Sequence, residues 1–228
     1  ADSADEKLRQ IHDFCRGQIV NRQRDGNGLT KEERRKLKPN GTAAQTLKSG
    51  SGSATDINTL FVALARAAGF EARLAMANDR TIFFYKPSIA VPFMFTRAVA
   101  AVQRGDKWTF FDPGATYLPA DMIDWRNGDT SIIIANENQA LIVPVASAPA
   151  ERSVRRQSAA FTLDANGLLE GEVTMEFTGY FEAAEKDSLD AATPEEIRKH
   201  LQALVEPHLK SAEVTAIKVE HANRALEP

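Results

Sequence analysis

The segment from Gly50 to Ala68 constrains the fold more than any other part of the chain. Small and polar residues come first, in the order Gly50-Ser51-Gly52-Ser53-Ala54-Thr55-Asp56. Ser53 and Asp56 have the spacing of a capping box, in which each side chain accepts the other residue's backbone N–H, so a helix should begin there. Apolar residues then recur at helical spacing, at Ile57, Leu60, Phe61, Leu64 and Ala68. The pattern predicts a buried helix that organises the core.

The residues before this helix predict further helical elements. An apolar periodicity favours a first helix over residues 4–20, and Thr30-Lys31-Glu32-Glu33 has the form of a second capping box. We expect a short helix from that box to Pro39 and another helical turn over residues 43–47.

Strand patterns follow the central helix. The predicted strands are residues 70–77, 99–103, 107–111, 131–135 and 140–144. Such strands should form an antiparallel sheet against the helix, which is an α+β architecture. The excursion 78–95 between the first two strands holds Phe83-Phe84-Tyr85, and we expect it either to shape a binding surface or to complete the core.

The register of the predicted hairpin places two charged residues near each other. If Arg104 lies opposite Lys107, then Arg97 and Asp112 share a face of the sheet at a diagonal position. A long side chain can span that separation. We therefore predict a salt bridge between Arg97 and Asp112.

These blocks resemble the transglutaminase-like superfamily, which has a papain-like core. In that family a glycine-containing loop ends in Cys-x-Asp at the start of a buried helix, a histidine then opens a strand, and a further strand closes on Asp-Pro. The chain resembles this pattern in order and spacing over residues 5–143. The resemblance implies that the triad positions are held by Ala54, Arg97 and Asp112.

With these residues the triad lacks both a nucleophile and a base. A thiolate at a helix N-terminus is stabilised by unpaired N–H groups, and a neighbouring imidazole serves as its base. The methyl group of Ala54 supplies no nucleophile, and the guanidinium of Arg97 stays protonated and cannot act as a base. An engineered Cys→Ala exchange would explain Ala54 but not Arg97, which favours natural loss. We predict that no intact catalytic triad and no acyl-enzyme chemistry exist at this site.

No other residue restores the missing pair. The only cysteine, Cys15, falls on the apolar side of the first helix and is predicted to pack in the core. No histidine lies between His12 and His200. We expect His12 to be solvated or to cap a helix, and the remaining histidines to lie on the surface: His200, His208 and His221.

Three interpretations of the function stay open. The first is a binding or scaffolding module that holds a peptide, protein or glycan in the former substrate cleft, with candidate cleft residues Gly50, Ser51, Gly52, Ser53, Thr55 and Asp56. The second is acyl transfer or amide hydrolysis by a hydroxyl of Ser51, Ser53 or Thr55 near Asp112, for which Lys48 is the nearest candidate base. The third is a structural spacer in a larger chain.

Composition limits the partners. The formal net charge of −3 gives no reason to expect nucleic acid or an anionic membrane. No apolar run reaches the length of a membrane span, so we expect no membrane insertion. One cysteine and scattered histidines predict no metal site, and nothing in the sequence calls for a cofactor. Residues 1–7 lack the features of a signal peptide, whereas the resemblance to exported bacterial relatives implies a periplasmic or envelope location.

The C-terminal part has a different character. We predict a core domain over residues 1–144, a linker over 145–152 and a partial β-rich domain over 153–228. In the last of these, strands 153–163 and 168–177 flank the turn Asp164–Gly167, helices follow at 180–189 and 195–205, and a last strand is expected at 213–220. We expect the missing strands and the flanking domains to belong to a longer protein.

Overall fold

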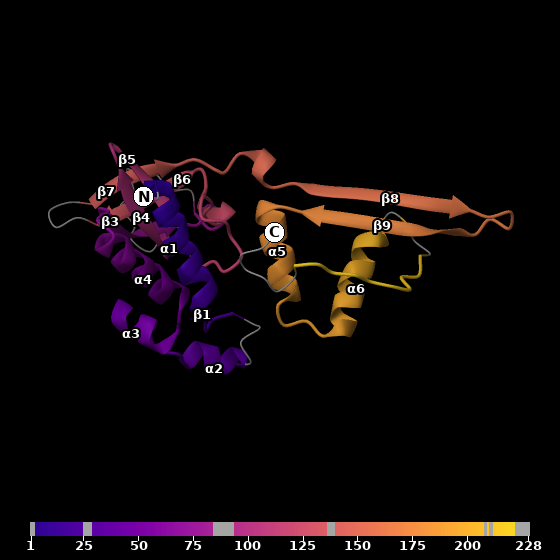
Figure 1. Ribbon diagram of the computed structural model, residues 1–228, viewed down its shortest axis with the longest axis horizontal. Helices are drawn as coiled ribbons and strands as arrows, with labels where there is room; N and C mark the ends of the chain where they lie inside the picture. The colour runs from indigo at the N-terminus through magenta and orange to yellow at the C-terminus, as the bar shows by residue number, and fades with distance from the viewer. Residues whose placement is uncertain are drawn as a thin grey trace.

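A computed structural model of the chain describes residues 3–24, 29–83, 94–135, 140–207, 209 and 212–221. Helices and a sheet are gathered in the N-terminal part, residues 3–145, and a long two-stranded hairpin extends away from it (Figure 1). The N-terminal part holds all the positions singled out by the resemblance.

Helix α4 (Ala54–Ala67) starts at the predicted capping box. Ser53 accepts the N–H of Asp56, and the Asp56 carboxylate accepts the N–H of Ser53. Most of the predicted apolar face is buried, but Leu64 is only half-buried and Ala68 is exposed. Ala68 is the C-cap residue, so it lies past the last turn that the sheet covers, and Ala65 takes the buried position.

A five-stranded antiparallel sheet packs against α4, as predicted. Its strands are β3 (Ala72–Asn78), β4 (Phe95–Arg104), β5 (Lys107–Phe111), β6 (Thr130–Ala135) and β7 (Ala140–Val145), in the spatial order β5-β4-β3-β6-β7. Because successive strand residues point to opposite faces, Ala100 and Val102 join the core beneath α4, and Val99 and Ala101 join a second cluster with β6. Much of β4, the strand that carries Arg97, is therefore buried on both faces of the sheet.

The remaining N-terminal elements surround α4. They are α1 (Ala4–Gln18), α2 (Lys31–Lys36), α3 (Ala43–Ser49) and the short parallel pair β1 (Val20–Asn21) and β2 (Ser51–Gly52). The second capping box is confirmed, since Thr30 and Glu33 exchange both bonds at the start of α2. Helix α1 packs on α4 through a cluster that includes Leu8, Cys15 and Ile19.

The C-terminal elements form the hairpin and two helices. Strands β8 (Arg155–Leu163) and β9 (Leu169–Phe177) are joined as predicted and are followed by α5 (Gly179–Leu189) and α6 (Pro194–Val205). Short 3₁₀ turns occur at Trp125–Asn127 and Ala150–Arg152. The predicted last strand is wrong, because residues 213–220 form no strand. A strand needs a neighbouring strand for its backbone hydrogen bonds, and no described strand pairs with this segment.

Helix α5 connects the hairpin region to the N-terminal part. Asp190, just after α5, accepts hydrogen bonds from Arg24 Nε at 2.9 Å and from the Tyr117 hydroxyl at 2.7 Å. The Tyr180 hydroxyl at the other end of α5 donates to the Ile123 carbonyl at 2.9 Å. These contacts tether α5 to the loop that follows β5 and, through Arg24, to the segment that follows β1. The predicted division into core domain, linker and β-rich domain stays a prediction.

Two sequence predictions fall outside the described residues. The aromatic segment predicted to shape a surface is described only as far as Phe83, since residues 84–93 are not described. His208 is likewise not described.

Candidate functional site

Ala54 occupies the first turn of α4, where its backbone is closely surrounded. Its N–H lies 3.3 Å from the Gln23 side-chain oxygen. The backbone of Gly114 packs directly on it: a Cβ at Gly114 would lie 2.6 Å from the Ala54 carbonyl oxygen and 2.8 Å from its Cα. Only glycine allows this approach. The loop after β5 is therefore held against the start of the helix.

Asn58, one turn after Ala54, connects three elements. It is fully buried; its amide nitrogen donates to the Ala98 carbonyl and to Asp112 Oδ1, each at 2.8 Å. Its oxygen accepts the N–H of Gly114, also at 2.8 Å. Asn58 is not among the site residues predicted from the sequence. Its signal was a polar residue inside an apolar helix, four positions after Ala54.

The predicted salt bridge between Arg97 and Asp112 is confirmed. Arg104 lies opposite Lys107 and Ala100 opposite Phe111, which is the register assumed in the prediction. Arg97 Nε donates to Asp112 Oδ2 at 2.8 Å, and its Nη2 lies 2.7 Å from the same oxygen. The Asp112 side chain has no exposed surface, whereas Arg97 keeps 31% of its own. Arg97 and Asn58 thus compensate a fully buried carboxylate, which would otherwise be costly.

A second arginine–aspartate pair lies beside the first. Arg126 binds Asp124 through Nε at 2.9 Å and Nη2 at 2.5 Å, and Arg97 Nη1 lies 3.8 Å from Asp124. Burial by itself would raise the pKa of Asp124, but the bonds from Arg126 and the charge of Arg97 outweigh it, so the pKa is lowered. No sequence pattern indicated this pair, in which Asp124 caps the short 3₁₀ turn that contains Arg126.

A small polar pocket opens where the two pairs meet. It has a volume of about 200 Å³ and is lined by Asp79, Thr96, Arg97, Arg126 and Asn127. Thr96 is a bulge residue, since Ala77 lies opposite Arg97 and Asn78 opposite Phe95. Bulges re-aim neighbouring side chains and are frequent beside functional sites.

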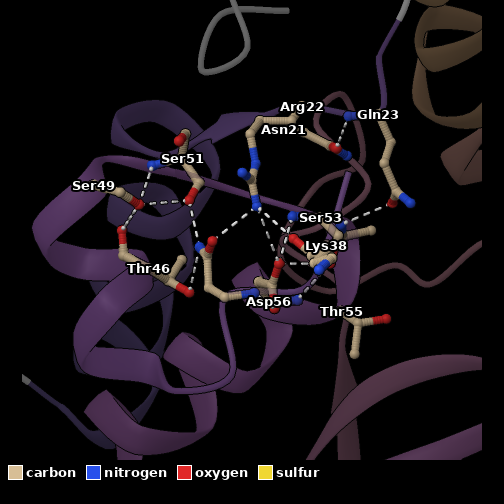
Figure 2. Close-up of polar contacts among 12 residues, drawn as sticks. Asn21, Arg22, Gln23, Lys38, Thr46, Ser49, Ser51, Ser53, Thr55 and Asp56 are labelled. Carbon is tan, nitrogen blue, oxygen red and sulfur yellow. Dashed lines mark hydrogen bonds and ion pairs between the residues drawn. The ribbon is translucent and has the colours of Figure 1, made fainter. Parts of the chain in front are cut away.

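The Gly-Ser loop is held by a separate network (Figure 2). Asp56 accepts bonds from the backbone of Asn40 at 3.1 Å and from Ser53 at 2.8 Å, and Arg22 lies 3.8 Å away. The Asn40 side chain in turn donates to the Ser51 carbonyl at 2.7 Å.

The two glycines of this loop have local explanations. Gly50 caps α3 in a left-handed conformation with φ of 61°, and a Cβ at Gly52 would lie 2.7 Å from the Asp56 Cβ. The candidate nucleophile Ser53 is engaged as the N-cap of α4, whereas Thr55 is exposed. A cleft-lining role for this loop stays a prediction.

Helix α1 contributes two buried titratable residues to the core beside α4, Cys15 and His12. Cys15 is fully buried as predicted, and burial raises its thiol pKa to about 12. The expectation for His12 is wrong: it is fully buried, with its ring 6.4 Å from that of Phe61 and 6.5 Å from that of Phe111. Burial lowers the pKa of His12 and favours the neutral ring. Of the C-terminal histidines, His221 is exposed, and His200 is half-buried against Glu185.

Among the described residues, no group of three or more histidine, cysteine or acidic side chains is placed to hold a metal ion. Among the same residues, no helix combines the length and apolar character needed to cross a membrane.

The arrangement defines a class of protein, an α+β domain in which the start of a buried helix meets the end of an antiparallel hairpin. Its family follows from comparison with family models. Residues 1–113 match the model of the transglutaminase-like superfamily, so this segment is a transglutaminase-like domain and belongs to that superfamily. Searches among curated proteins and among solved structures gave no match.

Proposed function

We propose that this transglutaminase-like domain has lost acyl-transfer chemistry and acts as a binding module, which holds a peptide segment in the former substrate cleft. The observation that carries the proposal is the Arg97–Asp112 ion pair. In a working triad the acid orients a base that gains and loses a proton. Here the acid is paired with a side chain that keeps its proton at any ordinary pH.

The loss of chemistry is also supported at the remaining triad position. Ala54 carries a methyl group where a nucleophile is required. The hydroxyl of the preceding residue, Ser53, donates to Asp56 at 2.8 Å as part of the helix cap. Asp56 belongs to a network that also includes Asn40 and Arg22, so activating Ser53 would disturb the start of α4.

A binding role is supported by the close contacts around Ala54 and by the pocket near Arg97. Gln23 contacts the N–H of Ala54, and Gly114 packs against the same residue, so the geometry around the nucleophile position persists without the nucleophile. Beside it, the pocket near Arg97 offers polar groups to a ligand. A spacer would need neither the close glycine contact nor an open polar pocket.

The test has a chemical arm and a binding arm. Intact-protein mass spectrometry would follow incubation with p-nitrophenyl acetate and with a glutamine-containing peptide, with and without a primary amine. We expect no acyl adduct on the protein and no amine incorporation into the peptide. The matched variant Ala54→Cys/Arg97→His restores both triad side chains and serves as the reference for live chemistry. An adduct on wild-type Ser51, Ser53 or Thr55 would replace this proposal with the hydroxyl mechanism.

The binding arm uses a library of random displayed peptides selected against the wild-type protein. Enriched peptides are then added to ¹⁵N-labelled protein, and shifted resonances are mapped. We expect the shifts to cluster around Ala54, Arg97 and Gly114. If no peptide is enriched, or if the shifts map elsewhere, the cleft is not a peptide-binding module.

A further inference from the structure

We propose that the pocket beside Arg97 binds a carboxylate group of the peptide in the former cleft, an inference that rests on the proposed function. The pocket combines two guanidinium groups with an exposed hydroxyl from Thr96. A planar guanidinium with five N–H donors matches the two oxygens of a carboxylate better than any other side chain does.

The two buried aspartates present both arginines to the pocket. Asp112 has no exposed surface and Asp124 keeps 11%, while Arg97 and Arg126 keep 31% and 45%. The acids therefore lie behind the guanidinium groups and fix their planes through Nε and Nη2. Such fixed donors lose little conformational entropy on binding, which is the advantage of a preorganised site.

Asp79 also lines the pocket, and its charge adds to those of Asp112 and Asp124, which already pair with the two arginines. Its Oδ1 accepts the N–H of Thr81 at 2.9 Å and the Thr81 hydroxyl at 2.6 Å. These bonds already satisfy one oxygen of that carboxylate. As an acceptor, Asp79 suits a ligand that also offers N–H donors, and a peptide backbone supplies them.

Size and sheet geometry favour a peptide over a larger ligand. A volume of about 200 Å³ falls below the roughly 300–1,000 Å³ of pockets that enclose drug-sized molecules, and it suits a single carboxylate-bearing group. On the β5 side of β4, Asn58 and Asp112 fill the space beside Ala98 and Arg97. An extended segment can instead approach over the exposed Thr96 and place one acidic group in the pocket.

The carboxylate has two sources in a peptide, an acidic side chain or a free C-terminus. Three probes separate them: Ac-Ala-Glu-Ala-NH₂, its neutral match Ac-Ala-Gln-Ala-NH₂, and Ac-Ala-Ala-Ala-OH. Each is titrated into ¹⁵N-labelled wild-type protein, and the Nε–H signals of Arg97 and Arg126 are followed. We expect at least one acidic probe to bind about tenfold tighter than the glutamine probe, because a hydrogen bond to a charged group is worth that much. The acidic probe that binds identifies the source.

Variants assign this preference to the pocket. Arg126→Gln should remove the advantage of the acidic probe, and Arg126→Lys should reduce it because a lysine cannot bind bidentately. The second variant also serves if the first does not fold. Arg156→Gln, which removes an exposed arginine paired with Glu176 on the hairpin, is the matched control and should keep the full preference.

Failure of this inference differs from failure of the proposed function. Equal binding of the acidic and neutral probes, or an unchanged preference in both Arg126 variants, would overturn the carboxylate site. So would the absence of any shift with all three probes. Peptides selected from the random library would still map to the cleft in those cases, and the binding module would stand. If the library yields no peptide at the cleft, the proposed function fails.

Discussion

The five-stranded sheet and the β8–β9 hairpin are both antiparallel strands rich in apolar residues, but they differ in burial. In β4, the five residues Ala98–Val102 are buried in succession, between α4 on one face and a second apolar cluster on the other. In β8, every residue is exposed. Both regions are held by cross-strand pairing, although β8 and β9 each pair on one side only. What separates them is the covering layer, and this layer determines how much each side chain contributes to stability.

The hairpin nevertheless has two distinct faces. One face is largely apolar and carries Ala159, Phe161, Leu163, Leu169, Val173, Met175 and Phe177. The other is polar and carries Arg156, Ser158, Thr162, Glu170, Glu172 and Glu176. Near the helices the apolar face is half-buried, but towards the tip Phe161 and Leu163 keep 41% and 66% of their surface exposed. A two-stranded hairpin alone is marginally stable, so this one depends on its own cross-strand pairs and on the helices at its base.

The largest expected contrast comes from one substitution made in both regions. Phe111→Ala should reduce the free energy of unfolding by about 3–5 kcal/mol, since it opens a cavity in a closed core. The Phe111 ring lies 5.0 Å from the ring of Phe61. Phe161→Ala on the hairpin should cost less than about 1 kcal/mol, the range of a cross-strand pair. Urea unfolding measures both. Equal losses would mean that the hairpin is covered in solution.

Ion pairs should show the next largest contrast. Arg97→Ala leaves Asp112 buried and charged without its partner, and it should cost about 3 kcal/mol, the low end for buried pairs because Arg97 is partly exposed. Arg156→Ala breaks the exposed pair with Glu176 and should change stability by less than about 1 kcal/mol. Adding Asp112→Asn to Arg97→Ala should recover part of the loss, because the neutral amide needs no counter-charge. No recovery would show that Arg97 stabilises the fold by packing alone.

The third prediction concerns pH and the buried His12. Its folded-state pKa is lowered by burial, so the unfolded state binds the proton more readily. The contribution of His12 to stability is therefore intact above the unfolded pKa of about 6.5 and decreases as the pH falls from there towards the folded pKa. The slope is at most about 1.4 kcal/mol per pH unit. His12→Leu should flatten the stability curve in this window. An unchanged slope would mean that the pKa of His12 is the same in the folded and unfolded states.

Features fixed by local spacing could be predicted from the sequence. The capping box at Ser53 and Asp56, the hairpin register and the Arg97–Asp112 pair all follow from residues close together in the chain or from one ladder. Strand alternation also located β8 and β9. It could not show that their apolar face is left exposed, because the same alternation occurs whether or not another layer covers it.

Features fixed by packing were missed. Asp124 and Arg126 are close in sequence, but only the fold brings them beside Arg97. Asn58 gains its role only where α4 meets the loop after β5. The error at His12 was avoidable. It is four residues after Leu8 and three before Cys15, so it shares their buried helix face.

Thiol reactivity compares exposure in the packed N-terminal part and in the hairpin. It needs only one surface substitution, which should hardly change the free energy of unfolding. Cys15 has no exposed surface and a pKa of about 12, so it should resist Ellman's reagent in the folded protein. Leu163→Cys places a second thiol at an exposed position on the hairpin and should react quickly. In denaturant the variant should show two reactive thiols and the wild type one. Fast labelling of wild-type Cys15 would mean that α1 detaches from α4 readily, and slow labelling at position 163 would mean that another surface covers the hairpin tip. Either result would weaken the contrast between a packed sheet and an uncovered hairpin.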